Sequence, residues 1–577
     1  MKSGKMKKSI YIISISFFIL VTQQISAQKE VFSFKAAGSP VNPKVTATWN
    51  KYYTYEGITD LCSRLVKAYP DLITMESAGK SYEGRDMIIL TITDEGKGVP
   101  SSKPAYWVDG NIHGNEIQGA EMALYTAWYL CEMYGHNEFI TELLGDKTFY
   151  IAPTINPDAR AIFTGTAGSL RSGVMPRDDD RDGLIDEDGF EDLNGDGEIS
   201  MMRRKTPEGN MKSDPVDPRK MVPVTPGERG EYEILGREGI DNDGDGLINE
   251  DGPGSYDPNR DWGYNWEPNY IQNGADKYPF SLPETRALRD FIMAHPNITG
   301  SQSFHNSGGM ILKGPSVEGG GSEIYSKADD AVYESIGRTG EKIIPGYRLV
   351  TIWKDMYTVW GGELDWMYGA VGAFVYSNEL WTSYLMFYDT TSTDNYEFDR
   401  LLLFEDAFIP WQEIEHPVYG KIEVGGFSKS FGRVHPGFML ETDSHRNMAF
   451  VLYNAWQTPK LEVSEINVRE LKGGLKEITA TVSNRRMMPT HSAQNIKYHI
   501  TPPDYITLEG PRVISAMVVT DPLNNVTREQ KRNPQRIEAE NIPGYGKVTV
   551  RWIARGNMQL TVRVTSIKGG TASATSK

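Results

Sequence analysis

Cysteine is the residue that this sequence has least of, with two in 577 residues. So low a content excludes a disulfide scaffold and a zinc site built from cysteine thiolates. Cys62 and Cys131 both fall in apolar helical patterns. We therefore expect two buried free thiols, with a single disulfide as the alternative.

Basic residues and long apolar runs are also scarce. The chain has 60 Lys and Arg against 77 Asp and Glu, a net charge of −17 and a pI near 5.2, which argues against nucleic-acid binding. After the first 27 residues no apolar run approaches the roughly 18 residues of a membrane span. We expect no transmembrane segment in the mature chain.

The first 27 residues have the composition of a secretory signal peptide. They contain four lysines and no acidic residue, then an apolar run over 10–21, and they end in the small residue Ala27. A basic start, a short apolar run and a small residue at the end are typical of such a signal. The sequence therefore predicts export, either into a periplasm or out of the cell.

What the chain does contain is enough apolar material for a large core. It is 39% hydrophobic, with 30 Tyr and 12 Trp. At roughly 150 residues per domain, its length allows three or four domains, or one large enzyme domain with an appendage.

Helix and strand patterns alternate along the first part of the chain. Alternation of this kind predicts an α/β fold whose mixed, largely parallel sheet is flanked by helices. The predicted helices are 52–69, 117–133, 283–294 and one near 446–456, and the predicted strands are 87–93, 104–109 and 149–152.

The pattern changes after Pro459 to short alternating runs separated by turn residues, which predicts an immunoglobulin-like β-sandwich with a flexible tail. Its expected strands are 461–468, 477–483, 496–500, 512–519, 547–554 and 558–565. The expected organisation is a signal peptide at 1–27, a catalytic domain at 28–457 with an acidic insertion at 165–255, and the sandwich at 458–577.

Two short stretches hold most of the negative charge. Residues 178–198 contain eleven acidic residues and one arginine, and residues 241–251 contain five acidic residues and no base. Runs of acidic residues are most often solvated loops. Here, however, an Asp-x-Asp-x-Asp-Gly-Leu-Ile pattern occurs twice, and a third, shorter version begins at Asp192.

Alternating oxygen ligands followed by a glycine turn suit a hard cation, so calcium loops are expected, although the bidentate Glu of an EF-hand loop is absent. The candidate calcium ligands are Asp178, Asp180, Asp182, Asp186, Asp241, Asp243 and Asp245.

A candidate zinc site begins with His113 and Glu116, which are three residues apart between a predicted strand and a predicted helix. A nitrogen and a carboxylate oxygen at this spacing can bind one zinc ion. His305, at the end of another predicted strand, supplies a third ligand. Three protein ligands leave a fourth position for water, which indicates a catalytic site.

Several further motifs occur in a fixed order around these residues. They are 79–85 (GKSYEGR), His113 with Glu116, 156–158 (NPD), 204–206 (RKT), Asn259 with Arg260, 283–286 (PETR), His305, Tyr357 followed by 361–362 (GG) and 365–366 (DW), and 377–380 (SNEL). Over about 45–455 the chain thus resembles the zinc carboxypeptidase family of carboxypeptidases A and B. Ala159 stands where that family has the glycine of NPDG, and Asp261 where it usually has Asn.

The resemblance implies a role for each matching residue. His113, Glu116 and His305 hold one catalytic zinc. Glu379 activates water with it, and Arg204 stabilises the oxyanion, which fixed positive charge can do effectively. Asn259, Arg260 and Tyr357 bind the terminal carboxylate of a peptide or protein substrate, and Arg85 serves a more distant subsite.

Some alternatives stay open at this point. Arg203 rivals Arg204, because the acidic insertion lies on both sides of them. Near the expected side-chain pocket, Glu363 favours a basic terminal residue and Leu364 an apolar one. The same scaffold also suits a cell-wall (murein) peptide amidase, or an inactive binding protein. The sandwich either contacts a cell surface or glycan or only braces the enzyme.

Overall fold

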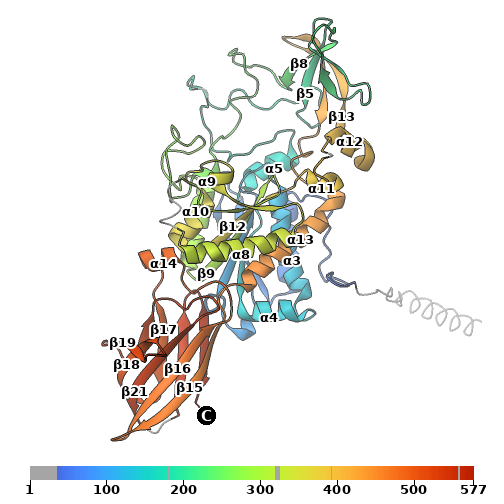
Figure 1. Cartoon of the computed structure of the whole chain (residues 1–577). Coiled ribbons are helices and arrows are strands. Elements are labelled where there is room, and N and C mark those ends of the chain that lie inside the picture. Colours follow the sequence, from blue (N-terminus) through green and yellow to red (C-terminus); the bar gives the residue numbers. More distant parts are fainter. Residues whose placement is uncertain (1–35, 180, 319–324, 392, 557–558, 577) are drawn as a thin grey trace, which may run out of the picture. The chain divides into compact units, whose positions relative to one another are not determined.

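The computed structural model describes residues 36–576 except 180, 319–324, 392 and 557–558 (Figure 1). The chain divides into two units, Met1–Thr46 and Ala47–Lys577, and all described helices and strands lie in the second. The expected signal peptide, 1–27, lies outside the described residues. No described helix has the length and apolar composition needed to cross a membrane.

An eight-stranded sheet forms the centre of the catalytic region, in the order β1-β2-β4-β3-β9-β12-β10-β11. The pairs β4–β3, β3–β9, β9–β12 and β10–β11 are parallel, and the other three pairs are antiparallel. This arrangement confirms the predicted mixed α/β sheet. The strands are β1 (Ile73–Lys80), β2 (Asp86–Ile92), β3 (Ala105–Gly110), β4 (Thr148–Ala152), β9 (Ile298–Asn306), β10 (Met310–Lys313), β11 (Arg348–Thr351) and β12 (Phe374–Leu380).

Helices pack on the faces of this sheet. The ring of Tyr376 in β12 lies 5.6 Å from the ring of Phe450 in α13, and its hydroxyl donates to the Tyr333 carbonyl in α8 at 2.7 Å. Figure 1 shows α3, α8 and α13 lying across the strands. The longer helices are α2 (Tyr55–Ala68), α3 (Gln118–Met133), α4 (Glu138–Asp146), α5 (Pro157–Gly165), α6 (Pro283–Ala294), α8 (Lys327–Ile343) and α13 (Gly437–Trp456), and the short ones are α9 (Ile352–Asp355), α10 (Glu363–Trp366), α11 (Tyr384–Phe387) and α12 (Asn395–Phe398).

Most predicted elements of this region are present, with small shifts at their ends. Helix α13 begins at Gly437, well before the expected residue 446, and strand β1 was not predicted. Both cysteines are buried and free, as expected.

The acidic insertion contributes to a second, six-stranded antiparallel sheet, in the order β13-β14-β5-β8-β6-β7. Two of its strands come from a hairpin far beyond the insertion, so the insertion shares this sheet with a distant segment of the chain. Its strands are β5 (Met201–Lys205), β6 (Met211–Ser213), β7 (Met221–Pro223), β8 (Tyr232–Arg237), β13 (Phe408–His416) and β14 (Gly420–Phe427).

The C-terminal region consists of two antiparallel sheets, β15-β16-β21-β18-β19 and β20-β17-β22-β23. Trp552 of the first sheet and Ile506 and Val562 of the second are fully buried in one core, as in a sandwich. The immunoglobulin-like label and the domain boundaries stay predictions. The strands are β15 (Leu461–Leu471), β16 (Leu475–Asn484), β17 (Asp504–Glu509), β18 (Arg512–Asp521), β19 (Val526–Gln530), β20 (Arg536–Ala539), β21 (Lys547–Arg555), β22 (Thr561–Ser566) and β23 (Gly570–Thr575).

Two predictions for this region were wrong. The expected strand 496–500 overlaps helix α14 (Ala493–Tyr498), which starts there because the Ser492 side chain accepts a hydrogen bond from the Asn495 amide. The expected flexible tail contains β23, whose backbone pairs with β22 from Thr575 to Gly570.

Candidate active site

The candidate site lies where three parallel strands end. His305 of β9 and Glu379 of β12 are direct neighbours in the register of the two strands, and His113 follows the end of β3. Side chains alternate between the faces of a strand, so Val375, Ser377 and Glu379 line the pocket while Tyr376 faces the helices. The carboxyl ends of parallel strands are the usual place for a site in such sheets.

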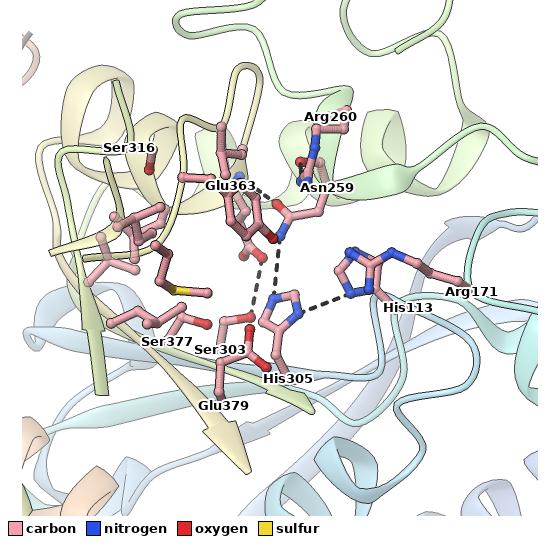
Figure 2. Close-up of a pocket in the computed structure, with 18 residues that line it drawn as sticks. His113, Arg171, Asn259, Arg260, Ser303, His305, Ser316, Glu363, Ser377 and Glu379 are labelled. Atoms are coloured by element: carbon pink, nitrogen blue, oxygen red, sulfur yellow. Dashed lines mark hydrogen bonds between the residues drawn. The ribbon is translucent and has the colours of Figure 1, made fainter. Parts of the chain in front are cut away.

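The three predicted zinc ligands converge on one point, and Figure 2 shows the two histidines of this set facing each other. Glu116 Oε2 lies 2.9 Å from Nδ1 of His113 and 2.9 Å from Nδ1 of His305, and the two Nδ1 atoms are 3.1 Å apart. All three residues are buried. Two imidazole nitrogens and a carboxylate oxygen at nearly equal separations fit a tetrahedral zinc ion, whose ligand atoms lie roughly 3.3 Å apart at bond lengths of about 2.0–2.1 Å.

An outer carboxylate orients the first ligand. Asp257 Oδ1 lies 3.1 Å from His113 Nε2, so a proton on Nε2 leaves the Nδ1 lone pair free for a metal. Burial raises the pKa of Asp257, but interactions with Arg260, His113 and Arg171 outweigh it and hold this pKa well below its usual range. The aspartate is therefore ionised.

The loop that carries His113 and Glu116 is held by close packing and by one buried arginine. A side chain on Gly114 would lie 2.2 Å from Ala159 Cβ, which explains the glycine. Arg160 is fully buried, donates to Asn111 Oδ1 and the Ile117 carbonyl, and pairs with Glu121 at 2.7 Å. This arginine fixes both ends of the loop.

Glu379 and Glu116 have opposite acidities. Burial raises the pKa of Glu116, but its interactions and hydrogen bonds with His113 and His305 outweigh burial and hold this pKa well below its usual range. Burial and repulsion by Glu116 raise the pKa of Glu379 to about 7, against the lowering effect of His305, Arg171 and Arg433. One carboxyl is thus a permanent anion and the other can exchange a proton near neutral pH.

The residues predicted to bind a terminal carboxylate line the same pocket. Arg260 is buried, and its Nη1 donates to the Asn259 carbonyl at 2.7 Å. Asn259 Oδ1 accepts a hydrogen bond from the Glu363 amide at 2.9 Å, which points its amide nitrogen toward His305 (Figure 2). Tyr357 is 54% exposed at the entrance. Arg85 lies outside this lining, paired with Asp158 at 2.7 Å.

The structure does not bring Arg204 into the pocket. It lies in β5, where strand pairing with β8 holds it in the insertion sheet and its guanidinium pairs with Glu233 at 2.5 Å. The rival Arg203 lies 4.1 Å from the ring centres of both Tyr232 and Trp411. Neither arginine lines the pocket.

Two arginines that were not predicted lie beside the metal ligands instead. Arg171 lines the pocket, with Nη1 2.8 Å from Glu116 Oε1 and Nη2 2.9 Å from His113 Nε2. Arg433 Nη2 also lies 2.8 Å from Glu116 Oε1. Arg171 stands alone among small residues in the sequence, without a motif, and Arg433 is far away along the chain, so neither gave a sequence signal.

A pair of buried carboxyl groups lies at the inner end of the pocket. Glu363 is 2% exposed and lines the pocket beside apolar side chains such as Leu312 and Val375. The Ser303 hydroxyl lies 2.6 Å from Asp109 Oδ1 and 3.4 Å from Glu363 Oε2. Burial and repulsion by Asp109 raise the pKa of Glu363 well above its usual range, and burial also raises the pKa of Asp109.

The candidate calcium ligands lie in the insertion, apart from this pocket, and Asp180 is outside the described residues. Carboxylate oxygens of Asp241, Asp243 and Asp245 lie within 4.8 Å of one another, as do those of Asp182, Glu187 and Asp243. Asp178 accepts a hydrogen bond from the Arg181 amide, and Asp186 accepts one from the Arg177 amide.

This fold and this set of side chains define a metal-dependent hydrolase with a mixed α/β sheet. Comparison with known proteins identifies its family. A family model described as zinc carboxypeptidase matches residues 58–182 and 228–396, and residues 460–577 match a domain of unknown function. The chain belongs to the zinc carboxypeptidase family.

Individual relatives match this chain with low sequence identity or over a short part of its length. Carboxypeptidase B of Astacus astacus is 26% identical over 374 residues, which cover 63% of this chain and 93% of that protein. Carboxypeptidase D of Homo sapiens is 33% identical over 95 residues, which cover 16% of this chain and only 7% of the human protein. Among solved structures, thrombin activatable fibrinolysis inhibitor matches with a TM-score of 0.44 and 16% identity, covering 72% of this chain and 80% of that one.

Proposed function

We propose that the protein is a zinc-dependent metallocarboxypeptidase that hydrolyses the C-terminal peptide bond of peptides or proteins. The observation that carries the proposal is that a titratable glutamate and a buried arginine line one pocket with His113 and His305, which form a zinc-type ligand set with Glu116. Family membership supports the same activity.

Substrate binding begins with the terminal carboxylate. Arg260 offers a planar pair of N–H donors that matches a carboxylate, and the Asn259 amide lies between Arg260 and the metal ligands. Tyr357, being largely exposed, is free to close over the bound residue. Together they place the last peptide bond of the substrate beside His305 and Glu379.

Proton transfer and charge stabilisation fall to Glu379 and Arg171. His113, Glu116 and His305 would hold zinc, which would supply a Lewis acid for the scissile carbonyl and for water. Glu379, whose pKa burial raises to about 7, takes the proton from the attacking water and passes it to the leaving amine. Arg171 lies beside the metal ligands and stabilises the developing oxyanion, the role that the motif resemblance gave to Arg204.

The side-chain pocket suits a terminal residue with an apolar stem and a positive tip. Its walls include Leu312, Val359 and Leu364, and its inner end carries Glu363. Glu363 Oε1 is buried and accepts no hydrogen bond from any described residue. A lysine or arginine side chain in this pocket would favour the ionised form of Glu363 and would pair with it.

The test uses peptides that differ only in their last group. We expect protein with one bound zinc to release the terminal residue from peptides ending in Lys, Arg or Leu with a free carboxylate. The same peptides with an amidated C-terminus should not be cleaved, and Glu379→Gln should bind zinc but lose at least about 10²-fold in kcat. A zinc-loaded wild type that releases no terminal residue contradicts the proposal.

A murein peptide amidase on the same scaffold is the second candidate. Arg260 favours the carboxypeptidase, because an enzyme that cuts inside a stem peptide needs no terminal carboxylate. Release of murein stem peptides, with the free-carboxylate peptides left intact, would favour the amidase.

We also propose that the protein is exported. The support is the basic and apolar composition of residues 1–27, and the measurement is the N-terminal sequence of the secreted chain, expected to begin just after Ala27. Contact of the sandwich with a glycan or a cell surface stays a prediction.

A further inference from the structure

The two carboxylate oxygens of Glu116 have different neighbours. Oε2 faces the two histidines of the metal site: it lies 2.9 Å from Nδ1 of His113 and 2.9 Å from Nδ1 of His305. Oε1 faces two guanidinium groups instead, and lies 2.8 Å from Nη1 of Arg171 and 2.8 Å from Nη2 of Arg433. Glu116 therefore has one oxygen that can bind a metal ion and one that already has two cationic partners.

Both oxygens of this carboxylate are held in place. The Asn306 amide donates to Oε2 at 3.1 Å, and the Glu116 side chain is buried. Charge-assisted hydrogen bonds from two arginines are strong, and a buried carboxylate that rotates away from them loses the partners that offset its desolvation. The side chain is thus fixed in an orientation that presents Oε2 alone to the metal site.

The segment that carries Arg433 is fastened to the metal-binding loop. Arg433 lies between β14 and α13, and its neighbour Val434 packs in a small apolar cluster with Ile117. The amide of His435 donates to Gln118 Oε1 at 3.1 Å. Ile117 and Gln118 directly follow the glutamate of the metal site in the chain, so these contacts place the Arg433 guanidinium beside it.

The acidic insertion positions both arginines. Arg171 lies near the start of the insertion, whereas the segment of Arg433 is reached through β14. This strand pairs with β5 of the insertion from Met201 to Arg203, and beyond it the Lys429 amide donates to Glu198 Oε2 at 2.9 Å. One arginine is therefore placed by the insertion directly and the other through the sheet that the insertion shares with β14.

We propose that Arg433 is a positioning residue of the metal site, which with Arg171 holds Oε1 of Glu116 so that this glutamate offers a single oxygen to the metal ion. The role rests on the proposed function, because it presumes a zinc ion. Two histidines and one carboxylate oxygen would leave a fourth position for water. A second carboxylate oxygen would raise the coordination number to five and weaken the metal as a Lewis acid.

The experiment replaces zinc by cobalt(II), because four-coordinate cobalt absorbs visible light more strongly than five-coordinate cobalt. We expect the intense, four-coordinate spectrum for the wild type and a weaker, five-coordinate spectrum for Arg433→Ala, in which Oε1 is freed. In competition with a chelator, this variant should bind zinc about tenfold more tightly, since it gains a ligand atom and loses a positive charge beside the metal. Its kcat on a peptide with a free C-terminal carboxylate should fall about tenfold.

Lys421→Met is the matched control. It also removes one positive charge, from a side chain of β14 that is 72% exposed and pairs with Glu413 at 2.7 Å. The cobalt spectrum, the zinc affinity and kcat of this variant should all equal those of the wild type.

Three results would overturn the proposal: a five-coordinate spectrum for the wild type, a spectrum of Arg433→Ala identical to that of the wild type, or weaker zinc binding by Arg433→Ala. Identical spectra with tighter zinc binding would mean that the arginine acts only through its charge, and weaker binding that it only supports the fold. Neither metal measurement needs a peptide. A protein that gives the expected spectra and affinities but releases no terminal residue would therefore contradict the proposed function alone.

Discussion

At the scale of single residues, the site gives different pKa values to two glutamates that would have similar pKa values in an unfolded chain. Glu116 and Glu379 have the same chemical group, yet their pKa values move in opposite directions because Glu116 lies against two histidines and Glu379 lies against Glu116. The ionised carboxylate suits metal binding, and the titratable one suits proton transfer. Their roles follow from their neighbours.

Arg171 provides the first prediction. Because its guanidinium lies beside Glu116 and His113, Arg171→Ala should lower kcat by about 10²–10³-fold while the zinc content stays at one. Arg204→Ala is the matched control and should leave kcat unchanged, since its guanidinium pairs with Glu233 in the insertion sheet. Steady-state kinetics on one peptide decide, and the reverse ranking would restore the motif-based assignment.

The second prediction concerns Glu363, which lines the side-chain pocket. Glu363→Gln keeps the size of the side chain and removes the carboxyl group that can pair with a basic terminal residue. The ratio of kcat/KM for peptides ending in Lys to peptides ending in Leu should fall by about 10–100-fold. Ser316→Ala, which changes another residue of the same pocket, should leave the ratio unchanged. An unaltered ratio in Glu363→Gln would show that this carboxyl does not select the substrate.

At the scale of elements, the loop after β3 depends on a buried ion pair. Arg160 and Glu121 are both fully buried and lie 2.7 Å apart, and Arg160 also holds Asn111 and Ile117. Arg160→Met would leave Glu121 as an unpaired buried charge and should cost about 3–5 kcal/mol of unfolding free energy. Urea unfolding measures the loss.

The double variant Arg160→Met with Glu121→Leu separates charge from loop geometry. It should regain much of the stability, because no buried charge is left alone. Zinc affinity should stay reduced in it, because the bonds to Asn111 and Ile117 are still missing. Full recovery of zinc affinity would show that the arginine acts only through its charge.

Many elements of the fold and the compact motifs of the site could be predicted from the sequence. Strands and helices with strong periodicity, such as β2 and α3, and residues inside compact motifs, such as His113 with Glu116, follow from local patterns. That His113 and Glu116 lie close to His305 and Glu379 was also predictable, because parallel strands end at one edge of the sheet.

Other features depend on contacts between distant segments. Arg171 lies in no motif. The long insertion separates it from Asn259 along the chain, so the sequence does not predict that both line one pocket. The insertion sheet recruits β13 and β14 from about two hundred residues further on, a pairing that no local pattern encodes. The acidic repeats were recognised by spacing, which predicted Asp182 and Asp243 but missed Glu187, although the structure groups a carboxylate oxygen of each within 4.8 Å.

At the scale of the whole molecule, two buried lysines connect the C-terminal sheets to the catalytic sheet. Lys568, in the turn between β22 and β23, is 1% exposed and donates to the Ile298 carbonyl at the start of β9. Lys147 is 3% exposed and donates to the Thr458 and Pro459 carbonyls. The C-terminal region thus braces the strand whose other end carries His305.

These lysines make stability depend on pH in a definite direction. Burial lowers the pKa of Lys568 and of Lys147 to about 7, whereas an unfolded lysine titrates near 10.4. Between these values the unfolded chain binds more protons than the folded one, so each lysine makes unfolding free energy rise with pH from about 7 to about 10. Below about 7 both states are protonated, and the cost of the buried charge is fully present.

Lys568→Met removes one of these protons and tests the sign. Between pH 7 and 10, the wild type should gain up to about 1.4 kcal/mol of unfolding free energy per pH unit relative to the variant. Lys547→Met, which changes an exposed lysine of the same region, should follow the wild type. Parallel curves for wild type and Lys568→Met would mean that Lys568 keeps its proton in the folded chain. The contact with β9 would then hold a buried charge rather than a neutral amine.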